Sequence, residues 1–166
     1  MVATKADLFN RLRELNISVT TVEHRPVFTV EQSQSIRGDI DGWHCKNLFL
    51  RDKSKKLWLL VTLEDAMVDL KKLRHLIGSG HLSFCPENIL GEVLGVKAGS
   101  VTPFALINDH EKCVNVVLDC NILEHELLNF HPLENTSTTT IRSSDLVHFI
   151  NGCGHSPQII DLNSYG

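Results

Sequence analysis

The stretch His44-Cys45-Lys46-Asn47-Leu48-Phe49-Leu50-Arg51 has the pattern of a β-strand that starts with a lysine and runs into apolar residues. Successive side chains of a strand point to opposite faces, so Lys46 shares a face with two leucines and Asn47 lies on the other face. A lysine beside a core is costly unless its ammonium reaches an anion, a carbonyl or a pocket. The stretch therefore predicts a strand that carries a candidate binding residue, Lys46.

The strand is expected to form a hairpin, because the apolar segments 46–51 and 57–62 flank the polar turn Asp52-Lys53-Ser54-Lys55-Lys56. Apolar periodicity and capping residues predict helices at 4–15, at 30–36, from Leu70 to Gly78, from Pro86 to Gly95 and at 144–151. Further strands are predicted at 20–23, 103–107, 114–119, 127–131, 138–141 and 158–161. We expect one α+β domain over residues 1–166, with a mixed, curved sheet flanked by helices.

Length and composition are those of a soluble globular protein. The chain has 166 residues, of which 42% are hydrophobic and 22% charged, which suits one domain with a full core. No apolar run approaches the roughly 20 residues that span a bilayer, so no membrane contact is expected. The N-terminus lacks the apolar segment of a signal peptide. A cytoplasmic location is the expectation.

The cysteines and histidines do not predict a disulfide framework or a metal site. The five cysteines are odd in number and include no CxxC pair, so reduced thiols are expected. The two ligand types come close together only in His44-Cys45 and in Cys153-Gly154-His155, and neither has a zinc-finger spacing. We expect no metal and no cofactor.

The charge balance limits the way in which the chain could bind nucleic acid. Sixteen basic residues against 20 acidic ones give a formal net charge of −4. A protein that grips a long stretch of nucleic-acid backbone usually has a basic surface. If this chain handles RNA, it is expected to touch a short end through a local basic patch.

Three pieces have residue types suited to binding or catalysis: Lys46-Asn47, the loop Gly95-Val96-Lys97-Ala98-Gly99-Ser100-Val101-Thr102-Pro103, and Asn129-Phe130-His131-Pro132. Gly99 lets the backbone approach a ligand closely, so that N–H groups can point at a carbonyl or a phosphate. His131 precedes a proline and is expected to be extended. Taken singly, the loop is a turn before a strand and His131 a hydrogen-bonded sheet histidine.

Together and in this order, the pieces resemble the YbaK/proline-tRNA-synthetase-insertion family of aminoacyl-tRNA deacylases, over essentially the whole chain. The matching runs are Phe28-Thr29-Val30-Glu31-Gln32, Lys46-Asn47-Leu48-Phe49-Leu50, Gly80-His81-Leu82-Ser83-Phe84, Leu94-Gly95-Val96, Gly99-Ser100-Val101-Thr102-Pro103-Phe104 and His131-Pro132-Leu133-Glu134-Asn135-Thr136. The last two runs, with Lys46-Asn47, look most like the free-standing branch that removes alanine mischarged onto proline tRNA.

The resemblance implies a YbaK-like fold and a trans-editing hydrolase that uses neither a metal nor a nucleophilic side chain. In the family, the lysine that matches Lys46 holds the terminal phosphate or ribose of the tRNA. The glycine that matches Gly99 contacts the aminoacyl carbonyl, and the residue that matches His131 shapes the amino-acid pocket. The ribose 2′-hydroxyl is thought to assist the attacking water. The substrate-binding positions that we carry over are Asn47, Ser100, Thr102 and Pro103.

The resemblance also implies partners and RNA contacts. The partner is the aminoacylated acceptor end of a tRNA, with tRNA(Pro) favoured and prolyl-tRNA synthetase as a further candidate. Lys46, Arg51 and His81 are the expected tRNA contacts. Arg51 stands where this branch often has a lysine, and His81 stands where an arginine is common. The hairpin lysines suit a solvated turn about as well as an RNA contact.

Three other functions stay open. The chain could remove another small amino acid, such as cysteine or serine, from a mischarged tRNA. It could be a non-catalytic module that binds tRNA ends or a synthetase. It could be a thiol hydrolase that uses Cys45, although a buried structural thiol is the more common role of such a residue. Ser100 lacks the G-x-S-x-G elbow of a serine hydrolase.

Overall fold

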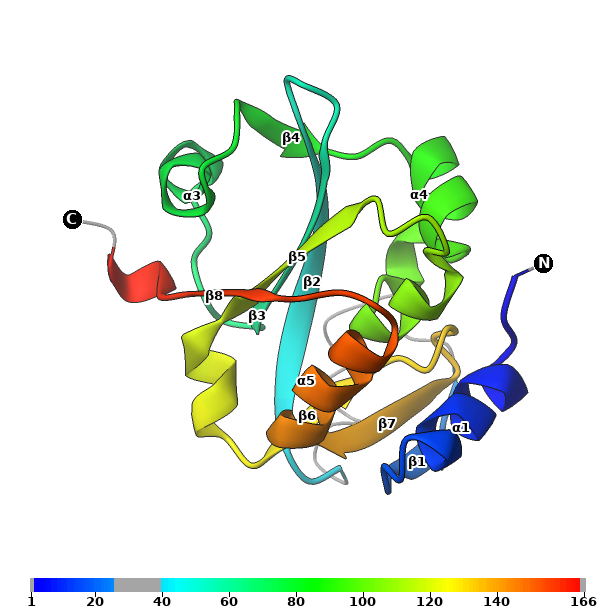
Figure 1. Ribbon diagram of the computed structural model, residues 1–166. Coiled ribbons are helices and arrows are strands. Elements are labelled where there is room, and N and C mark those ends of the chain that lie inside the picture. The colour runs from blue at the N-terminus through cyan, green and yellow to red at the C-terminus, as the bar shows by residue number, and fades with distance from the viewer. Residues whose placement is uncertain (1, 26–39, 165–166) are drawn as a thin grey trace.

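The computed structural model describes residues 2–25 and 40–164, which form one mixed sheet with helices on both faces (Figure 1). The strands are β1 (Thr20–Glu23), β2 (Trp43–Asp52), β3 (Leu57–Leu63), β4 (Leu82–Phe84), β5 (Val114–Asp119), β6 (Leu127–Phe130), β7 (Ser137–Arg142) and β8 (Gln158–Ile160). The α-helices are α1 (Lys5–Glu14), α3 (Leu70–Ile77), α4 (Glu87–Leu94) and α5 (Ser143–Gly152). Short 3-10 helices are η1 (Ala98–Ser100), η2 (Pro103–Asn108), η3 (Cys120–Glu124) and η4 (Leu162–Ser164).

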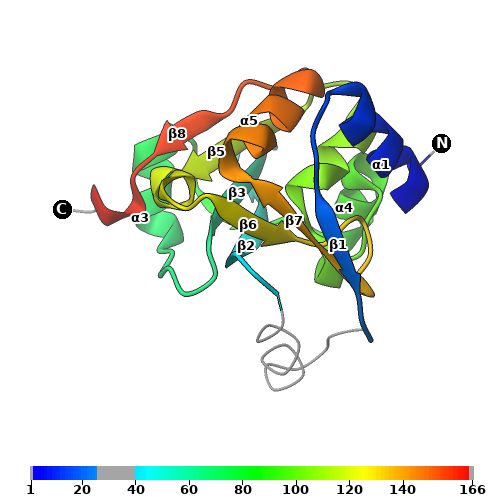
Figure 2. The same ribbon diagram turned by 90° about the horizontal axis from the view of Figure 1, so that it is seen from below.

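The sheet has the strand order β1-β7-β6-β2-β3-β5-β8, and β4 pairs with β2 off this path. The β6–β2, β3–β5 and β5–β8 pairs are parallel, and the others are antiparallel. Figure 2 shows β1 beside β7 at one end of this order. The expected α+β class with a mixed sheet and flanking helices is confirmed.

The long strand β2 holds the two parts of the sheet together. Its full length pairs with β3, from Cys45 to Arg51. On its other edge, β6 pairs only with Trp43 and His44, and β4 pairs only with residues 50–52. Within the described ranges, no strand lies on this edge between the two pairings. The segment of β2 that contains Lys46 and Asn47 therefore pairs with a described strand on one edge only, the edge towards β3.

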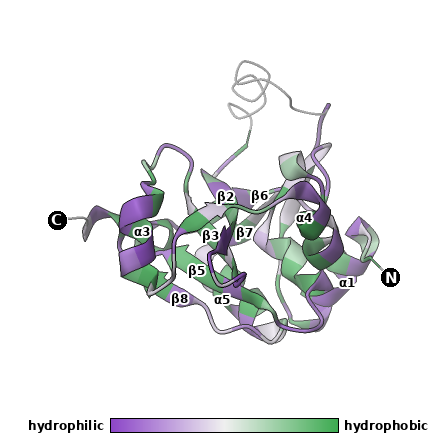
Figure 3. Cartoon of the chain, turned by 90° about the horizontal axis from the view of Figure 1, so that it is seen from above, coloured by the Kyte–Doolittle hydropathy of each residue, from purple (hydrophilic) through white to green (hydrophobic). Residues whose placement is uncertain are grey.

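Each face of the sheet has its own hydrophobic core. The larger core joins one face to α1, α4, α5 and η2, with Phe104 in edge-to-face contact with both Phe130 and Phe149. The smaller core joins the opposite face to α3, through Leu50, Leu60 and Leu73 among others. In Figure 3 the central strands are mainly green, whereas α3 carries purple turns on its outer side. The two cores hold β2 rigidly from both sides.

Local sequence explains most of the element boundaries. Thr4 and Asp7 form the predicted capping box of α1: the Thr4 hydroxyl accepts from the Asp7 N–H at 3.1 Å, and the Thr4 N–H donates to the Asp7 carboxylate at 2.8 Å. Gly78 ends α3 with a φ of 73°, which a residue without a Cβ adopts without strain. The hairpin prediction is confirmed by β2 and β3, which pair across the predicted turn.

The strand predicted at 103–107 is wrong. Residues Pro103–Asn108 form the 3-10 helix η2. Pro103 lies in the first turn, where an N–H group would have no carbonyl partner within the helix, so its lack of an N–H costs nothing. The Thr102 hydroxyl caps the helix by accepting from the Phe104 N–H at 3.3 Å. The residues are buried and apolar, so periodicity did not distinguish a short helix from a strand.

The predicted helix at 30–36 and the run Phe28-Thr29-Val30-Glu31-Gln32 lie outside the described residues. No helix of the described part of the chain is long and apolar enough to cross a membrane.

Candidate active site

Lys46 is half-buried on β2 and its ammonium has a protein partner. Its Nζ donates to the backbone carbonyl of Ala66. The cross-strand neighbour of Lys46 is Thr62, which is fully buried and donates its hydroxyl to Asp119 at 2.7 Å. A lysine beside a core needs an anion, a carbonyl or a pocket for its ammonium, and Lys46 reaches a carbonyl.

The Ala66 end of this contact borders an open cavity of about 570 Å³. Its lining residues are Leu63, Asp65, Ala66, Met67, Asp119, Asn121, Glu124, His125, Leu162 and Asn163. Lys46 is not itself a lining residue, but its ammonium contacts Ala66 of the cavity wall.

Asn47 points away from Lys46, towards the glycine loop. Its side-chain amide donates to the backbone carbonyl of Val101 at 3.1 Å, and its Oδ1 is buried with no hydrogen-bond partner in the described structure. This contact fixes β2 to the segment that contains Gly99 and Ser100. Opposite orientations of Lys46 and Asn47 are those expected from strand alternation.

The second half of the glycine loop is mostly buried. Ser100, Thr102 and Pro103 are buried, and the Ser100 N–H donates to the Lys97 carbonyl at 2.8 Å. Lys97, Ala98 and Gly99 are exposed, and a Cβ added at Gly99 would meet no atom within 4 Å. The surface over Gly99 is thus open to a ligand, while Ser100 after it is buried.

His131 directly follows β6 and lies outside the strand. His44 of β2 pairs in parallel with Asn129 of β6, so Lys46 and His131 each come two residues after this pair along the chain. The Nδ1 of His131 bonds to the Ser137 carbonyl at 3.2 Å. Burial lowers the pKa of His131, and the nearby His24 acts in the same direction, although the Ser137 bond opposes it.

The site residues thus form two groups. Lys46 of β2 and His131 each come two residues after the His44–Asn129 pair, and Asn47 connects β2 to the loop of Gly99, Ser100, Thr102 and Pro103. Thr102 and Pro103 are buried below the surface of that loop, where they begin η2. Both groups meet at the part of β2 that has one open edge.

Arg51 and His81 lie together at the far end of β2. With Asp52, Lys53, Lys55 and Ser83, they line a cavity of about 410 Å³. The contact follows from the sheet, because Arg51 pairs with Ser83 of β4. The carboxylate of Asp52 is used internally, by the N–H groups of Ser54 and Lys56 and by the Trp58 indole. The cavity therefore gathers cationic side chains, and it is our candidate for the local basic patch.

Neither candidate metal pair from the sequence is assembled as a ligand set. His155 is bonded to Asp109 at 2.9 Å, with both side chains buried. A different group, Asp119, Cys120 and Asp161, has ligand atoms within 4.8 Å of one another. Asp119 already accepts from Thr62 through one oxygen and from Asn121 through the other. That no metal is needed stays a prediction.

Cys45 is poorly suited to nucleophilic attack. Burial, together with the negative charge of Glu64, raises the pKa of its thiol to about 12. A nucleophilic cysteine needs the thiolate form, whose fraction at neutral pH is on the order of 10⁻⁵ for such a pKa.

Three residues near the site had no signal in the sequence: Ala66, whose carbonyl receives the Lys46 ammonium; His24, which faces His131; and Lys5 of α1, which contacts the loop after His131. A backbone carbonyl has no residue type, and the other two come from distant parts of the chain. Their spacing could not have revealed these contacts.

With this geometry established, comparison with known proteins shows the family. The family model described as an aminoacyl-tRNA editing domain matches residues 24–149. The chain belongs to this family, and it is a hydrolase of the ester bond between an amino acid and tRNA.

Similar proteins cover nearly the whole chain. The prolyl-tRNA editing protein ProX of Acetoanaerobium sticklandii is 36% identical over 95% of this chain and 97% of its own length. Prolyl-tRNA synthetase associated domain-containing protein 1 of Bos taurus is 40% identical over 96% of this chain and 95% of its own length. A solved structure of a candidate trans-editing enzyme for prolyl-tRNA synthetase has the same fold, with a TM-score of 0.73 at 17% identity, and the match covers 97% of this chain and 98% of that one.

Proposed function

We propose that the protein acts in trans on alanine mischarged onto tRNA(Pro) and releases free alanine and tRNA. The names of the relatives, which refer to prolyl-tRNA editing and to prolyl-tRNA synthetase, support the choice of tRNA. Alanine is supported by the sequence runs at Lys46-Asn47, 99–104 and 131–136. A cytoplasmic location and prolyl-tRNA synthetase as a partner belong to the same proposal.

The observation that carries the proposal is the position of Lys46. The half-buried lysine donates to the carbonyl of Ala66, a residue that lines an open cavity, and an ammonium has two more N–H donors. Those donors suit the terminal phosphate or ribose of the tRNA 3′ end. His131, directly after β6, would border the amino-acid pocket.

Hydrolysis in this site would rest on positioning and on backbone electrostatics. An aminoacyl ester is activated, so a positioned water and a stabilised oxyanion suffice for its cleavage. The open surface over Gly99 would let the acyl carbonyl approach backbone N–H groups, and the ribose 2′-hydroxyl would orient the attacking water. The water adds to the acyl carbon, the bond to the ribose oxygen breaks, and that oxygen takes up a proton.

A small pocket would explain why a separate enzyme is needed. A synthetase site that holds proline cannot strongly reject alanine, since each missing methylene is worth only about 1–3 kcal/mol. A second site that admits alanine and excludes proline corrects the error after charging. Asn47 would hold the loop side of this site in place through its contact with Val101. That loop also contains Ser100, Thr102 and Pro103.

The decisive experiment is deacylation of tRNA(Pro) charged separately with alanine, serine, cysteine or proline. Alanine is expected to be released fastest, and proline to be retained. Faster release of serine or cysteine would assign the other small-residue specificity. Tight binding of tRNA ends without hydrolysis of any ester would indicate the non-catalytic module.

Lys46→Ala is expected to reduce deacylation at least a hundredfold with little change in melting temperature. The substitution removes the ammonium and leaves the Ala66 carbonyl at the wall of an open cavity, where water can reach it. Single-turnover deacylation and thermal denaturation measure the two effects. Lys71→Ala, an exposed lysine of α3, is the matched control. Wild-type rates in Lys46→Ala would contradict the proposed role.

A further inference from the structure

The loop that follows His131 needs support from other parts of the chain. It connects β6 to β7 through residues 131–136. Leu133 in this loop has a φ of 73°, in the left-handed region that a branched side chain rarely adopts. Such a conformation persists only where surrounding contacts determine it. The contacts of this loop therefore decide where His131 sits.

Two of these contacts close the loop from within. The His131 ring bonds to the Ser137 carbonyl at 3.2 Å, which joins the two ends of the loop. The Thr136 hydroxyl donates to the Glu134 carboxylate at 2.9 Å. The loop is also tied to the rest of the fold, because the His24 N–H donates to the Thr136 carbonyl at 2.8 Å and Leu133 packs against the main core.

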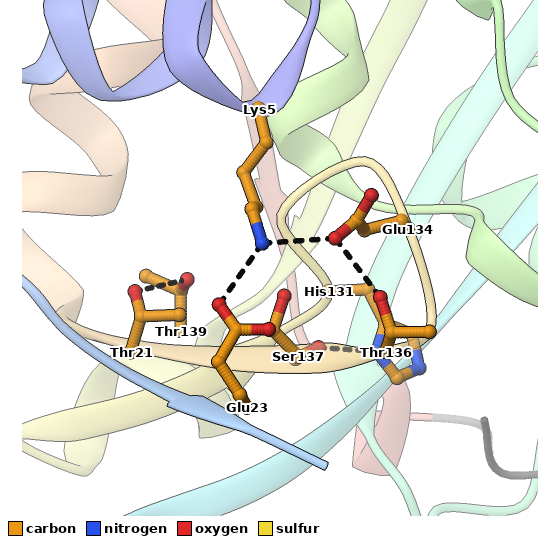
Figure 4. A network of polar contacts seen from close by, with 8 residues as sticks. All are labelled: Lys5, Thr21, Glu23, His131, Glu134, Thr136, Ser137 and Thr139. Carbon is orange, nitrogen blue, oxygen red and sulfur yellow. Dashed lines mark hydrogen bonds and ion pairs between the residues drawn. The ribbon is translucent and has the colours of Figure 1, made fainter. Parts of the chain in front are cut away.

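Lys5 adds a side-chain connection from this loop to α1 and β1. Its ammonium lies 2.9 Å from the Glu134 carboxylate of the loop and 2.9 Å from the Glu23 carboxylate of β1 (Figure 4). Glu23 in turn pairs with Ser137 of β7, the residue whose carbonyl holds the His131 ring. The contacts form a closed circuit from His131 through Ser137, Glu23, Lys5 and Glu134 back to the loop.

The position of Lys5 is itself well determined. Lys5 is the first residue of α1 and lies within the capping box, directly after Thr4, and α1 is anchored by Leu8 and Leu12 in the main core. The hydrogen bonds to Glu134 and Glu23 raise the pKa of Lys5, so it stays charged at neutral pH. The same pairing lowers the pKa of Glu134, so the carboxylate is ionised as well.

We propose that Lys5 is a positioning residue, which holds the loop of residues 131–136 so that His131 keeps the amino-acid pocket small. This inference rests on the proposed editing function and adds a residue that lies outside the matched family region, 24–149. Loss of the clamp would let the loop and His131 shift, and larger amino acids would be admitted. Lys5 acts through Glu134 and touches neither the ester nor the attacking water.

The clamp is a modest interaction, which makes it testable without unfolding the protein. The Lys5, Glu23 and Glu134 side chains are 27%, 67% and 45% exposed, and ion pairs of that exposure contribute little to global stability. The position of the loop is more sensitive than global stability, because the left-handed conformation of Leu133 depends on the surrounding contacts.

The test compares Lys5→Met, Lys5→Arg and Glu134→Gln with wild type. The readout is the ratio of kcat/KM for alanine to kcat/KM for the bulkier threonine, both esterified to the same tRNA(Pro). We expect Lys5→Met and Glu134→Gln each to lower this ratio about five- to tenfold. Lys5→Arg, which keeps the positive charge, should retain most of the wild-type ratio. Arg11→Met, on the same helix with a partner at Glu14, is the matched control and should leave the ratio unchanged.

Glu134→Gln separates positioning from direct RNA contact. It keeps the Lys5 charge but removes the carboxylate that Lys5 grips. An unchanged ratio in Glu134→Gln beside a lowered one in Lys5→Met would overturn the proposal and indicate that Lys5 contacts the substrate. An unchanged ratio in Lys5→Met, or an equal effect of Arg11→Met, would also overturn it.

The imidazole NMR signals of His131 provide a readout that does not depend on activity. These signals are expected to shift from their wild-type positions in Lys5→Met and Glu134→Gln, and to stay close to those positions in Lys5→Arg. If wild type fails to hydrolyse the alanine ester, the proposed function fails, but these shifts still decide whether Lys5 positions His131. Unshifted His131 signals in both variants would refute the positioning role on their own.

Discussion

Burial determines the protonation state of the reactive side chains near β2. Cys45 keeps its proton because burial and Glu64 raise its pKa, whereas His131 loses its proton because burial and His24 lower its pKa. Lys46, in contrast, has its ammonium held by the Ala66 carbonyl. This combination of an inert thiol, a neutral imidazole and an oriented cation suits recognition of an ester better than covalent catalysis.

Gly99→Ala should separate ligand access from folding. The added methyl group would meet no protein atom within 4 Å, so the melting temperature should stay within a few degrees of wild type. Deacylation should fall about tenfold or more, because the methyl group would occupy the space over the backbone that we assign to the acyl carbonyl. Gly91→Ala is the matched control, since its Cβ also meets nothing within 4 Å. Unchanged deacylation in Gly99→Ala would place the carbonyl elsewhere.

The neutral state of His131 predicts how stability depends on pH. In the unfolded chain a histidine titrates near 6.5, and in the folded protein the pKa of His131 lies lower. The unfolded state therefore binds more protons below about pH 6.5. The stability associated with neutral His131 is fully present above that pH and is lost as pH falls through the folded pKa, by at most about 1.4 kcal/mol per unit.

Urea denaturation at pH 7.5, 6.5 and 5.5 checks this sign. In His131→Gln the decline in unfolding free energy between pH 6.5 and 5.5 should be smaller than in wild type. His110→Gln, at an exposed position, serves as the control. Equal declines in wild type and His131→Gln would show that the imidazole is not held neutral.

Among the structural elements, the β2–β3 hairpin links the two functional regions. Lys46 lies near one end of β2, and Arg51 near the other, where the turn and β4 form the basic cavity. A single strand thus fixes the spacing between the site that we propose for the aminoacyl end and the basic cavity that we propose for the adjoining RNA backbone. Because the rest of the surface carries net negative charge, we expect few phosphate contacts.

A shallow salt dependence of tRNA binding is the consequence. Each neutralised phosphate adds roughly 0.7–0.9 to the slope of log affinity against log salt, and we expect about two to four contacts. Arg51→Ala should reduce the slope by about one contact and weaken binding to different tRNAs alike. Lys71→Ala should change neither. A steep slope, or tight binding of tRNA trimmed of its 3′ end, would contradict the local patch.

The elements also show which features the sequence can reveal. The hairpin, α3 and its end at Gly78 have strong local signals and were predicted. Strand β4 has only three residues and exists through its pairing with β2, so no periodicity could reveal it. The opposite directions of Lys46 and Asn47 followed from alternation alone, but the Val101 and Ala66 carbonyls that they reach depend on tertiary structure.

For the molecule as a whole, a buried Asp109–His155 pair joins the start of β5 to the segment before β8. Asp109 accepts from the Cys113 and Val114 N–H groups at 3.1 and 2.9 Å and from His155 at 2.9 Å. Burial opposes ionisation of Asp109, but these hydrogen bonds outweigh it, and its pKa lies below the ordinary value. The pair is remote in sequence from every proposed catalytic residue and serves stability.

Asp109→Asn should therefore lower the unfolding free energy by about 2–4 kcal/mol, because an amide has one acceptor oxygen for bonds that now use two. Deacylation by the folded fraction should stay near wild type. Urea denaturation measures the loss, and Glu92→Gln at an exposed position of α4 is the control. A loss below about 0.5 kcal/mol would mean that the pair is not important for stability.

The position of β1 at the end of the sheet has a consequence for how the chain is made. Among the described strands β1 pairs only with β7, and Thr20 pairs with Thr140. The strand β1 can therefore join the sheet only after β7 has been synthesised. At roughly 5–20 residues per second, the wait on the ribosome is on the order of ten seconds. During that time β1 has no described strand to pair with. Lys5 can meet Glu134 only after the loop of residues 131–136 has been made, so the clamp that we propose forms well after α1 has been synthesised.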